Sequence, residues 1–552
     1  MDERYYFDEN LLALSDRDPA LCTRLSRAKS KADRYVFLES RSGEMVPAWV
    51  DQKGVSHPLH SLVDPVREGN RLIASAGGEG FLIFFGLGGG FAVAAALERK
   101  ETQRALVIDY DIGSIAALLG SKAYRRLFRD PRFHLLVDPS DEAVRQAVLD
   151  YYQPALLGGI RVIPLRIRVG FGQSQFSGAG DAVNAAISTI SADYSVQAYF
   201  GRRWFSNIIR NLIRAEEQDG PVPTIRRAAI TAAGPSLDVQ LPQLAQKRKG
   251  LFLIATDTSL PALLHAGIEP DAIVSIDCQH ISYQHFMQGI PERIPLYLDL
   301  ASPPLVASRS RRPRFFAGGH PLARYAAQYW RPLPLVDTSG GNVTYAALSL
   351  ADMLGAEQTE LYGADFSYPL GYTYSRGTYL YPHFEIRQNR FSGLESFFSA
   401  FLFRNKPLDK VIREDTWYYE TATLTRYRRL LEEKTGAIRT AVIPVKGLGP
   451  DLKVRANLTE NPRTIRLFAP GSSSMSAEDF LREYRRKIRE LPPIGETPWR
   501  YYKNLSPPEH SIFTTLLPAF AAVKRRNPQY NTAEQFEAVR DYSLKELDKL
   551  LR

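Results

Sequence analysis

Short apolar runs alternate with helix-like segments along most of this chain. The first series of such runs covers residues 81–85, 105–108 and 133–137. Short apolar runs are typical of strands buried on both faces of a sheet, and strands separated by helices are expected to run parallel. A second series covers residues 228–233, 251–255, 272–276, 295–298 and 314–317. The sequence therefore predicts an α/β protein with two Rossmann-like α/β domains joined by a helical segment.

The length and the positions of the breakers suggest how these domains are divided. A chain of 552 residues exceeds what one hydrophobic core organises. A long helical pattern covers residues 178–218, and Gly220, Pro221 and Pro223 mark a boundary after it. The predicted division is an N-terminal segment (1–60), a Rossmann-like domain (61–175), a helical linker (176–221), a second α/β domain (222–395) and a mainly helical C-terminal region (396–552).

Composition favours an ordinary globular protein. Hydrophobic residues make up 44% of the chain and charged residues 24%, which argues against wholesale disorder. The net charge of +10 is spread over short clusters without a nucleic-acid-binding motif, so nucleic acid is not an expected partner. The two cysteines, Cys22 and Cys278, cannot build a disulfide framework. This pattern favours a reducing, cytoplasmic location.

The apolar run at residues 81–97 invites a transmembrane interpretation. It is slightly short for a bilayer span, and glycines at 86 and 88–90 interrupt its centre. A buried strand, a glycine turn and a helix explain it better. The N-terminal residues 1–6 are acidic and aromatic, unlike a signal peptide. We therefore predict a soluble protein without stable membrane insertion.

The glycine turn at 86–90 is followed by Asp109 at the end of the next predicted strand. Glycines for a phosphate or methionyl group and an acid for a ribose are typical of dinucleotide or S-adenosylmethionine sites. No second constellation for a transferred group follows between residues 110 and 175. Because a lone glycine turn is weak evidence, we predict a Rossmann-like scaffold that has lost its ligand.

The second α/β domain carries small or polar residues after several predicted strands. Gly234, Pro235 and Ser236 follow the first strand directly, and Thr256 and Asp257 end the next one. Ligands of open α/β sheets bind at this edge, where helix N-termini also attract phosphate. The alternative interpretation is that these residues only form tight turns and helix caps.

Two further small-residue loops lie downstream in the same domain. One contains Ser339, Gly340 and Asn342 before an apolar helix, and the other contains Asp365 and is followed by tyrosines, including Tyr368 and Tyr374. Backbone N–H groups and tyrosine hydroxyls can both donate to a phosphate. Together with the loop at Gly234, they predict a nucleotide-sugar site.

A metal site in this domain is not expected. Asp277 ends a third strand, where it could bridge to a metal or simply accept from backbone amides. Cys278, His280 and His285 lie close in sequence, but their spacing matches no strong zinc pattern and a fourth ligand is missing. The domain also lacks a convincing pair of carboxylates separated by one residue.

These loops carry a family resemblance. The segments that carry it are residues 233–237, 255–257, 268–271, 339–343 and 363–366. They resemble the motility-associated factor (Maf) family of flagellin glycosyltransferases, whose central domain is similar to 6-hydroxymethylpterin pyrophosphokinase (MptE-like) proteins and, more distantly, to bacterial CMP-sialic-acid sialyltransferases. The resemblance covers residues 222–385 well.

The resemblance implies transfer of a nonulosonic acid from a CMP donor to a serine or threonine of a protein acceptor, expected to be flagellin. It implies no cofactor besides the CMP-activated sugar and no metal. Its alternatives are a pyrophosphokinase-like diphosphotransferase and a catalytically inactive motility adaptor. This chain departs from the family pattern near the tyrosines expected to contact the phosphate. Thr373-Tyr374 replaces the Ser-His pair of many Maf proteins, and Ser367 separates Phe366 from Tyr368.

The implied roles are assigned residue by residue. Tyr374 would donate to the departing phosphate, and His383 is the candidate base. Substrate-binding positions are Gly234, Pro235, Ser236, Thr256, Asp257, Ser339, Gly340, Asn342, Asp365 and Tyr368.

Overall fold

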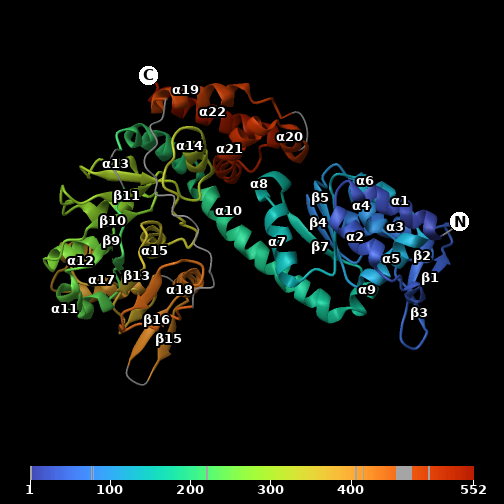
Figure 1. Cartoon of the computed structure of the whole chain (residues 1–552), viewed down its shortest axis with the longest axis horizontal. Coiled ribbons are helices and arrows are strands. Elements are labelled where there is room, and N and C mark those ends of the chain that lie inside the picture. Colours follow the sequence, from blue (N-terminus) through green and yellow to red (C-terminus); the bar gives the residue numbers. More distant parts are fainter. Residues whose placement is uncertain are drawn as a thin grey trace. The chain divides into compact units, whose positions relative to one another are not determined.

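The computed structural model describes residues 3–75, 77–78, 80–218, 222–404, 407–413, 416–455, 475–494 and 498–552 (Figure 1). The predicted breakers Gly220 and Pro221 lie outside the described residues. The chain forms two compact units. Unit 1 comprises residues 1–199, 492–510 and 517–539, and unit 2 comprises residues 200–491, 511–516 and 540–552.

Unit 1 is built on a four-stranded parallel sheet in the order β6-β5-β4-β7. Its strands are β4 (Phe81–Phe85), β5 (Arg104–Asp109), β6 (Phe133–Val137) and β7 (Ile160–Pro164). All five residues of β4 are buried, as expected for a strand covered on both faces. The predicted strands at 81–85, 105–108 and 133–137 are therefore confirmed.

The first sixty residues share the core of unit 1. Ala13, Leu14, Leu21 and Leu25 belong to the same buried cluster as Leu82. These residues lie on the helices α1 (Glu3–Ser15) and α2 (Pro19–Arg27). The short helix η1 (Ala32–Arg34) follows, and then an antiparallel sheet in the order β1-β2-β3. Its strands are β1 (Tyr35–Glu39), β2 (Met45–Val50) and β3 (Ser56–Pro58).

The other helices that lie wholly within unit 1 complete it. They are α3 (Pro65–Ala74), α4 (Phe91–Glu98), α5 (Ile112–Ser121), α6 (Arg125–Arg129), α7 (Asp141–Tyr151), α8 (Pro154–Leu157), α9 (Arg166–Gly170) and α20 (Pro498–Asn504). Three longer helices have residues in both units, namely α10 (Gln173–Glu216), α21 (Pro507–Arg526) and α22 (Thr532–Leu550).

Unit 2 contains a seven-stranded sheet in the order β12-β11-β10-β9-β8-β13-β17, with every neighbouring pair parallel. Its strands are β8 (Arg227–Thr231), β9 (Phe252–Thr256), β10 (Ala272–Ser275), β11 (Leu296–Asp299), β12 (Pro313–Phe316), β13 (Gln358–Tyr362) and β17 (Ala441–Pro444). The strand order reverses between β8 and β13, so this pair is the topological switch point where such sheets bind ligands.

The strand β17 extends this sheet with residues well past position 395. Its pairing with β13 runs from Gln358 with Ala441 to Leu361 with Pro444. A separate antiparallel sheet, in the order β14-β16-β15, joins Tyr368–Pro369 (β14) to Asp409–Ile412 (β15) through Trp417–Glu420 (β16). The predicted α/β class, with two Rossmann-like sheets and a helical C-terminal region, is confirmed.

The remaining helices lie around these two sheets of unit 2. They are α11 (Ser236–Lys247), α12 (Leu260–His265), η2 (His280–Phe286), α13 (Pro304–Ala307), α14 (Pro321–Tyr329), α15 (Val343–Met353), α16 (Leu380–Glu385), α17 (Leu394–Phe403), α18 (Ala422–Thr435) and α19 (Ala477–Glu490). Across the described part of both units, every helix is too short or too polar to cross a bilayer.

Candidate functional site

At the switch point, the chain's own groups occupy the loop after β8. The Ser236 backbone N–H donates to Asp365 Oδ2 at 2.8 Å, and the Ser236 hydroxyl donates to Asp365 Oδ1. Leu448 N–H in turn donates to Ser236 Oγ at 2.6 Å. Burial raises the pKa of Asp365, and the two bonds from Ser236 oppose that rise. Ser236 and Asp365, both predicted to bind substrate, are brought together and bonded to each other.

Gly234 is needed here for close packing. A Cβ at Gly234 would collide with Asp365 Oδ2 and with the carbonyl oxygen of Gly363. Gly447 has the same role on the opposite side, because a Cβ there would collide with the Ser236 hydroxyl. Pro235 precedes the first residue of α11 and provides no side-chain cap.

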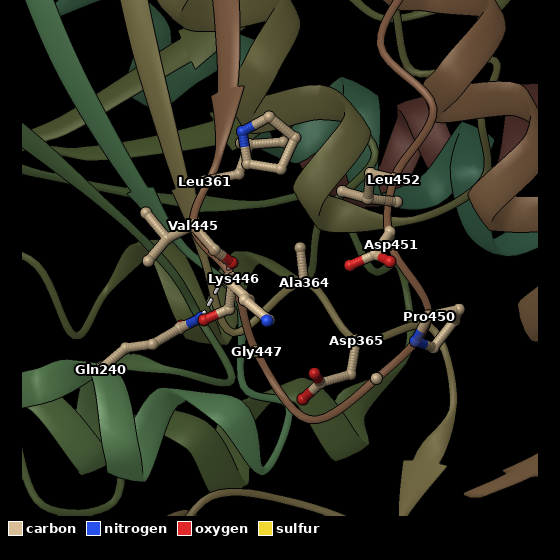
Figure 2. A pocket seen from close by; sticks show the side chains of 12 residues that line it. Gln240, Leu361, Ala364, Asp365, Val445, Lys446, Gly447, Pro450, Asp451 and Leu452 are labelled. Atoms are coloured by element: carbon tan, nitrogen blue, oxygen red, sulfur yellow. Dashed lines mark hydrogen bonds between the residues drawn. The ribbon is translucent and has the colours of Figure 1, made fainter. Parts of the chain in front are cut away.

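We call residues 445–452 the strap, since this segment follows β17 and passes over the Ser236–Asp365 pair. Gln240 Nε2 on α11 donates to the carbonyl oxygens of Val445 and Lys446 at 3.0 and 3.1 Å (Figure 2). Beneath the strap lies a cavity of about 280 Å³ on the β13–β17 side of the switch point. Its polar lining includes Gln240, Asp365, Lys446 and Asp451.

Asp257, directly after β9, accepts hydrogen bonds from its neighbours on both carboxylate oxygens. Thr258 donates to Asp257 Oδ1 through its backbone N–H at 2.7 Å and its hydroxyl at 3.0 Å. The Ser275 hydroxyl donates to Asp257 Oδ2 at 2.7 Å. Thr256 is also bonded internally, since its hydroxyl donates to Ser259 Oγ at 3.0 Å. These polar side chains are buried and organise the edge of the sheet.

Asp277 follows the neighbouring strand β10 and has fewer bonds. Gln279 N–H donates to Asp277 Oδ1 at 2.9 Å, and within the described residues no other donor is bonded to its carboxylate. Burial raises the pKa of Asp277, and the negative charge of Asp257 raises it further. Asp257 and Asp277 thus lie near each other, which the one-dimensional sequence did not show.

Three tyrosines lie around a single guanidinium close to these acids. Burial raises the pKa values of Tyr368, Tyr374 and Tyr379, and the positive charge of Arg404 acts on all three in the opposite direction. The charge of Asp257 also reaches Tyr374 and Tyr379. The Arg404 guanidinium lies over the Phe401 ring, which also contacts the Tyr374 ring. Phenol O–H donors and a cation in one neighbourhood are groups suited to an anion.

Two hydroxyls in the segment that carries Tyr368 and Tyr374 are buried without a hydrogen-bond partner in the part of the chain that the structure describes. They belong to Ser367 and Thr373. Native proteins rarely leave buried polar atoms unpaired, so such atoms often mark a place where a ligand or water completes the structure.

The predicted loop before α15 is held by an ionic cluster. Lys434 Nζ and the Tyr345 hydroxyl donate to Asp337 Oδ2 at 2.7 and 2.9 Å, and Ser339 N–H donates to Asp337 Oδ1 at 3.0 Å. Asn342 caps α15 by accepting from Tyr345 N–H at 3.0 Å. Gly340 packs directly against the Tyr345 ring, so a side chain there would clash.

His383, the base predicted from sequence, is exposed on α16. Its ring packs against that of Phe384, with 5.5 Å between centroids. No hydrogen bond or ion pair joins it to Tyr374 or Tyr379 among the residues that the structure describes. Its role remains a prediction.

Sequence reasoning missed Arg404 and Tyr379. Arg404 directly follows α17 and is separated along the chain from the tyrosines that its charge reaches. Tyr379 follows Tyr374 in the same tyrosine-rich segment, where nothing in the local sequence distinguishes it. The one local signal was the density of aromatic residues between 366 and 403, which indicates packing as readily as binding.

Groups of three or more His, Cys, Asp or Glu side chains placed to hold a metal ion are absent from the described residues. The side chains of Cys278 and His285 do not form such a group with Asp277. The His285 ring instead packs edge-on against Tyr379, with 4.6 Å between centroids.

Comparison with known proteins agrees with the arrangement of unit 2. Residues 204–371 match the family model of 6-hydroxymethylpterin diphosphokinase MptE-like proteins. Two uncharacterised proteins of Treponema pallidum (strain Nichols) are 31% and 33% identical over 163 and 159 residues. These matches cover 29% and 28% of this chain, but 78% and 56% of the relatives.

The structural likeness extends over the full chain. A Maf glycosyltransferase from Magnetospirillum magneticum AMB-1 superposes with a TM-score of 0.57, covering 100% of this chain and 96% of the other. Only 15% of the residues are identical, so this likeness concerns the fold. Together with the sequence matches, it shows that the chain contains an MptE-like domain over residues 204–371 and has the fold of a Maf glycosyltransferase.

Proposed function

We propose that this protein is a glycosyltransferase that moves a nonulosonic, sialic-acid-like sugar from a CMP donor to a serine or threonine hydroxyl of a protein, with flagellin as the acceptor. The observation that carries the proposal is the group formed by Tyr368, Tyr374, Tyr379 and Arg404. It offers three phenol donors and a positive charge at the ligand-binding edge of a parallel sheet.

The leaving group explains why such an arrangement favours this reaction. When the sugar departs, negative charge develops on the phosphate of CMP, and preformed donors that point at it lower the barrier. Phenols are protonated at neutral pH, and burial raises the pKa values of Tyr374 and its two neighbours further, so all three remain donors. Arg404 supplies the cation that a divalent metal provides in other nucleotide-sugar enzymes.

The proposal is tested by binding and by transfer. Isothermal titration with CMP should show binding to the purified chain, and Arg404→Gln should weaken it roughly tenfold, the effect expected for one charge-assisted hydrogen bond of about 1.5 kcal/mol. Arg387→Gln is the matched control, since the Arg387 guanidinium also lies over a phenylalanine ring of α17, that of Phe397. The affinity of the Arg387→Gln variant for CMP should stay within about twofold of the wild-type value.

Transfer should be visible as a mass increase of flagellin incubated with CMP-pseudaminic or CMP-legionaminic acid. Because phenols and a guanidinium can stabilise the phosphate, we expect the rate to survive EDTA. Loss of transfer on chelation, with recovery on adding Mn²⁺, would contradict the metal-free scheme.

A diphosphokinase is the second candidate, favoured by the MptE-like match over residues 204–371 and by the nearby acids Asp257 and Asp277. Phosphoryl transfer from ATP uses magnesium held by carboxylates. Calorimetry that shows binding of ATP with Mg²⁺ and none of CMP would replace the glycosyltransferase proposal with this one.

A further inference from the structure

The carboxylate of Asp277 differs from the other acids at the edge of the unit 2 sheet. Asp257 receives hydrogen bonds on both oxygens. Asp299, at the end of β11, is 1% exposed, accepts from Ala301 N–H at 2.8 Å and packs against Gly318. Asp365 is bonded on both oxygens to Ser236. Among the described residues, Asp277 and Asp299 each accept one hydrogen bond, from Gln279 and Ala301, and of these two Asp277 is the one that is not fully buried.

Asp277 is also the least enclosed of the four. Its neighbours Asp257, Asp299 and Asp365 are 3%, 1% and 4% exposed, whereas Asp277 is half-buried. A carboxylate that is partly exposed and has an unused oxygen can meet a substrate hydroxyl. The three buried acids instead serve the loops that carry them.

The charged and titratable groups around Asp277 come from several elements. Asp257 on β9 raises its pKa, while His285 on η2 and Arg203 on α10 oppose that rise. The charge of Asp277 in turn raises the pKa values of Tyr379 and of Tyr427 on α18.

Tyr379 connects this acid to the anion-binding side. Its ring packs edge-on against that of His285, with 4.6 Å between centroids, and the charges of Arg404, Asp257 and Asp277 all act on the pKa of its phenol. A donor sugar whose phosphate lies at Arg404 would thus have its reacting carbon on the side of Asp277. A base must lie within hydrogen-bond reach of the hydroxyl it activates, on the side from which that hydroxyl attacks.

We propose that Asp277 is the general base that activates the acceptor hydroxyl, a proposal that rests on the function proposed above. The serine or threonine proton moves to the free oxygen of Asp277 as the acceptor oxygen bonds to the anomeric carbon. The bond from that carbon to the phosphate oxygen breaks, and its electron pair leaves with CMP. The proton on Asp277 then passes to solvent.

The test uses Asp277→Asn in the full chain. General base catalysis contributes about 10²- to 10⁴-fold, so transfer to flagellin should fall by that factor. The affinity for CMP, measured by calorimetry, should change by less than about threefold, because the base does not contact the leaving group. The acid Glu385 on α16 is exposed, so Glu385→Gln makes the same change of charge at a carboxylate that faces solvent and should transfer normally.

The pH profile provides an independent readout. A base works only when unprotonated, so the rate should fall as pH drops through the raised pKa of Asp277, and Asp277→Asn should lose this acid limb. The apparent pKa of the wild-type limb should lie above the value of about 4 for an ordinary Asp. Because burial also raises the pKa of Asp365, the assignment depends on the loss of the limb in Asp277→Asn and on the rescue of Asp277→Ala. Formate added to Asp277→Ala should restore part of the rate.

Each result decides between defined alternatives. Wild-type transfer by Asp277→Asn, or an equal loss of transfer and CMP affinity, would overturn the assignment. So would a larger loss in His383→Ala, which would make His383 the base. If the wild-type chain binds CMP and transfers sugar, these results concern Asp277 alone. If it does neither, the proposed function itself fails.

Discussion

The two parallel sheets of this protein end in loops that use similar residue types for opposite purposes. In unit 1, the glycine turn at 86–90 and the acid Asp109 reproduce the sequence pattern of a dinucleotide site, yet the protein's own side chains occupy it. In unit 2, no such pattern exists, but Asp277 accepts a single hydrogen bond among the described residues, and we propose that it and the tyrosines near Arg404 meet the ligand. This comparison leads us to expect that spare hydrogen-bonding capacity, more than a sequence motif, marks the ligand site.

The site in unit 1 is closed by a buried ion pair. Asp109 is fully buried, accepts from Leu87 N–H at 2.8 Å and pairs with Arg168 at 2.9 Å. The Tyr124 hydroxyl donates to the Gly88 carbonyl oxygen at 2.7 Å, and a Cβ at Gly88 would meet the ring of His60 at 2.6 Å. The acid that would bind a ribose therefore binds an arginine.

The largest expected effect concerns that pair. Arg168→Met should destabilise unit 1 by about 3–5 kcal/mol, since it leaves the buried Asp109 charge without its partner. Hydrogen exchange at the β4 and β5 amides, followed by mass spectrometry, measures this loss. The double change Asp109→Asn with Arg168→Met should cost less, because it removes both charges. Wild-type exchange in the single variant would show that the pair is not what closes the site.

The next effect concerns the leaving group in unit 2. Tyr374→Phe should lower the transfer rate by roughly ten- to a thousandfold, as expected when one donor to a developing anion is lost. Donor affinity should change less, because the bond strengthens mainly in the transition state. Tyr329→Phe, at an exposed tyrosine on α14, is the control. Should Tyr374→Phe be silent, Tyr368 or Tyr379 serves the phosphate.

A smaller effect is expected from the cluster below the 338–342 loop. Burial acts to raise the pKa of Asp337, but bonds from Lys434 and Ser339 hold it well below its usual range. The resulting stabilisation is present above the unfolded pKa of about 4 and is lost as pH falls below it. Because the Asp337 side chain is 42% exposed, we expect no more than about 1 kcal/mol.

This acid sensitivity should depend on the lysine. Thermal melting at pH 5 and pH 3 should show a smaller difference for Lys434→Met than for the wild type. An equal acid shift in both proteins would mean that other carboxylates account for it.

The last prediction is that ligands of dinucleotide and methyltransferase sites have no effect on the melting temperature. S-adenosylmethionine and NAD should leave the melting temperature unchanged, whereas saturating CMP should raise it, since a ligand that binds only the folded state stabilises it. S-adenosylmethionine binding that Asp109→Ala abolishes would show that the unit 1 site is open, and the contrast between the two sheets would disappear.

The sequence predicted the elements better than the contacts between them. Strands such as β4 and β9 consist of consecutive apolar residues, and local composition is enough to recognise them. The residues after these strands were also found, including Asp257 and Ser236. Local pattern could not show that neighbouring side chains already satisfy both.

Long-range neighbours were beyond the reach of the sequence. Leu448 reaches Ser236 across 212 positions, and Gln240 reaches Val445 across 205. Such contacts depend on the order of strands in the sheet. The sequence also could not show that one oxygen of Asp277 has no donor in the described part of the chain, because that depends on which residues the fold brings near it.

The position of β17 has a consequence for biosynthesis. During translation, β8 and β13 are made long before Ala441–Pro444, so the growing chain presents β13 as an open sheet edge. Open edges pair readily with other chains, and slow long-range pairing extends this exposure. The strap can cover Ser236 only after β17 has joined the sheet. The switch point of the nascent protein therefore stays uncovered until synthesis has passed residue 450, and a chain terminated earlier would present both an unfinished edge and an uncapped loop.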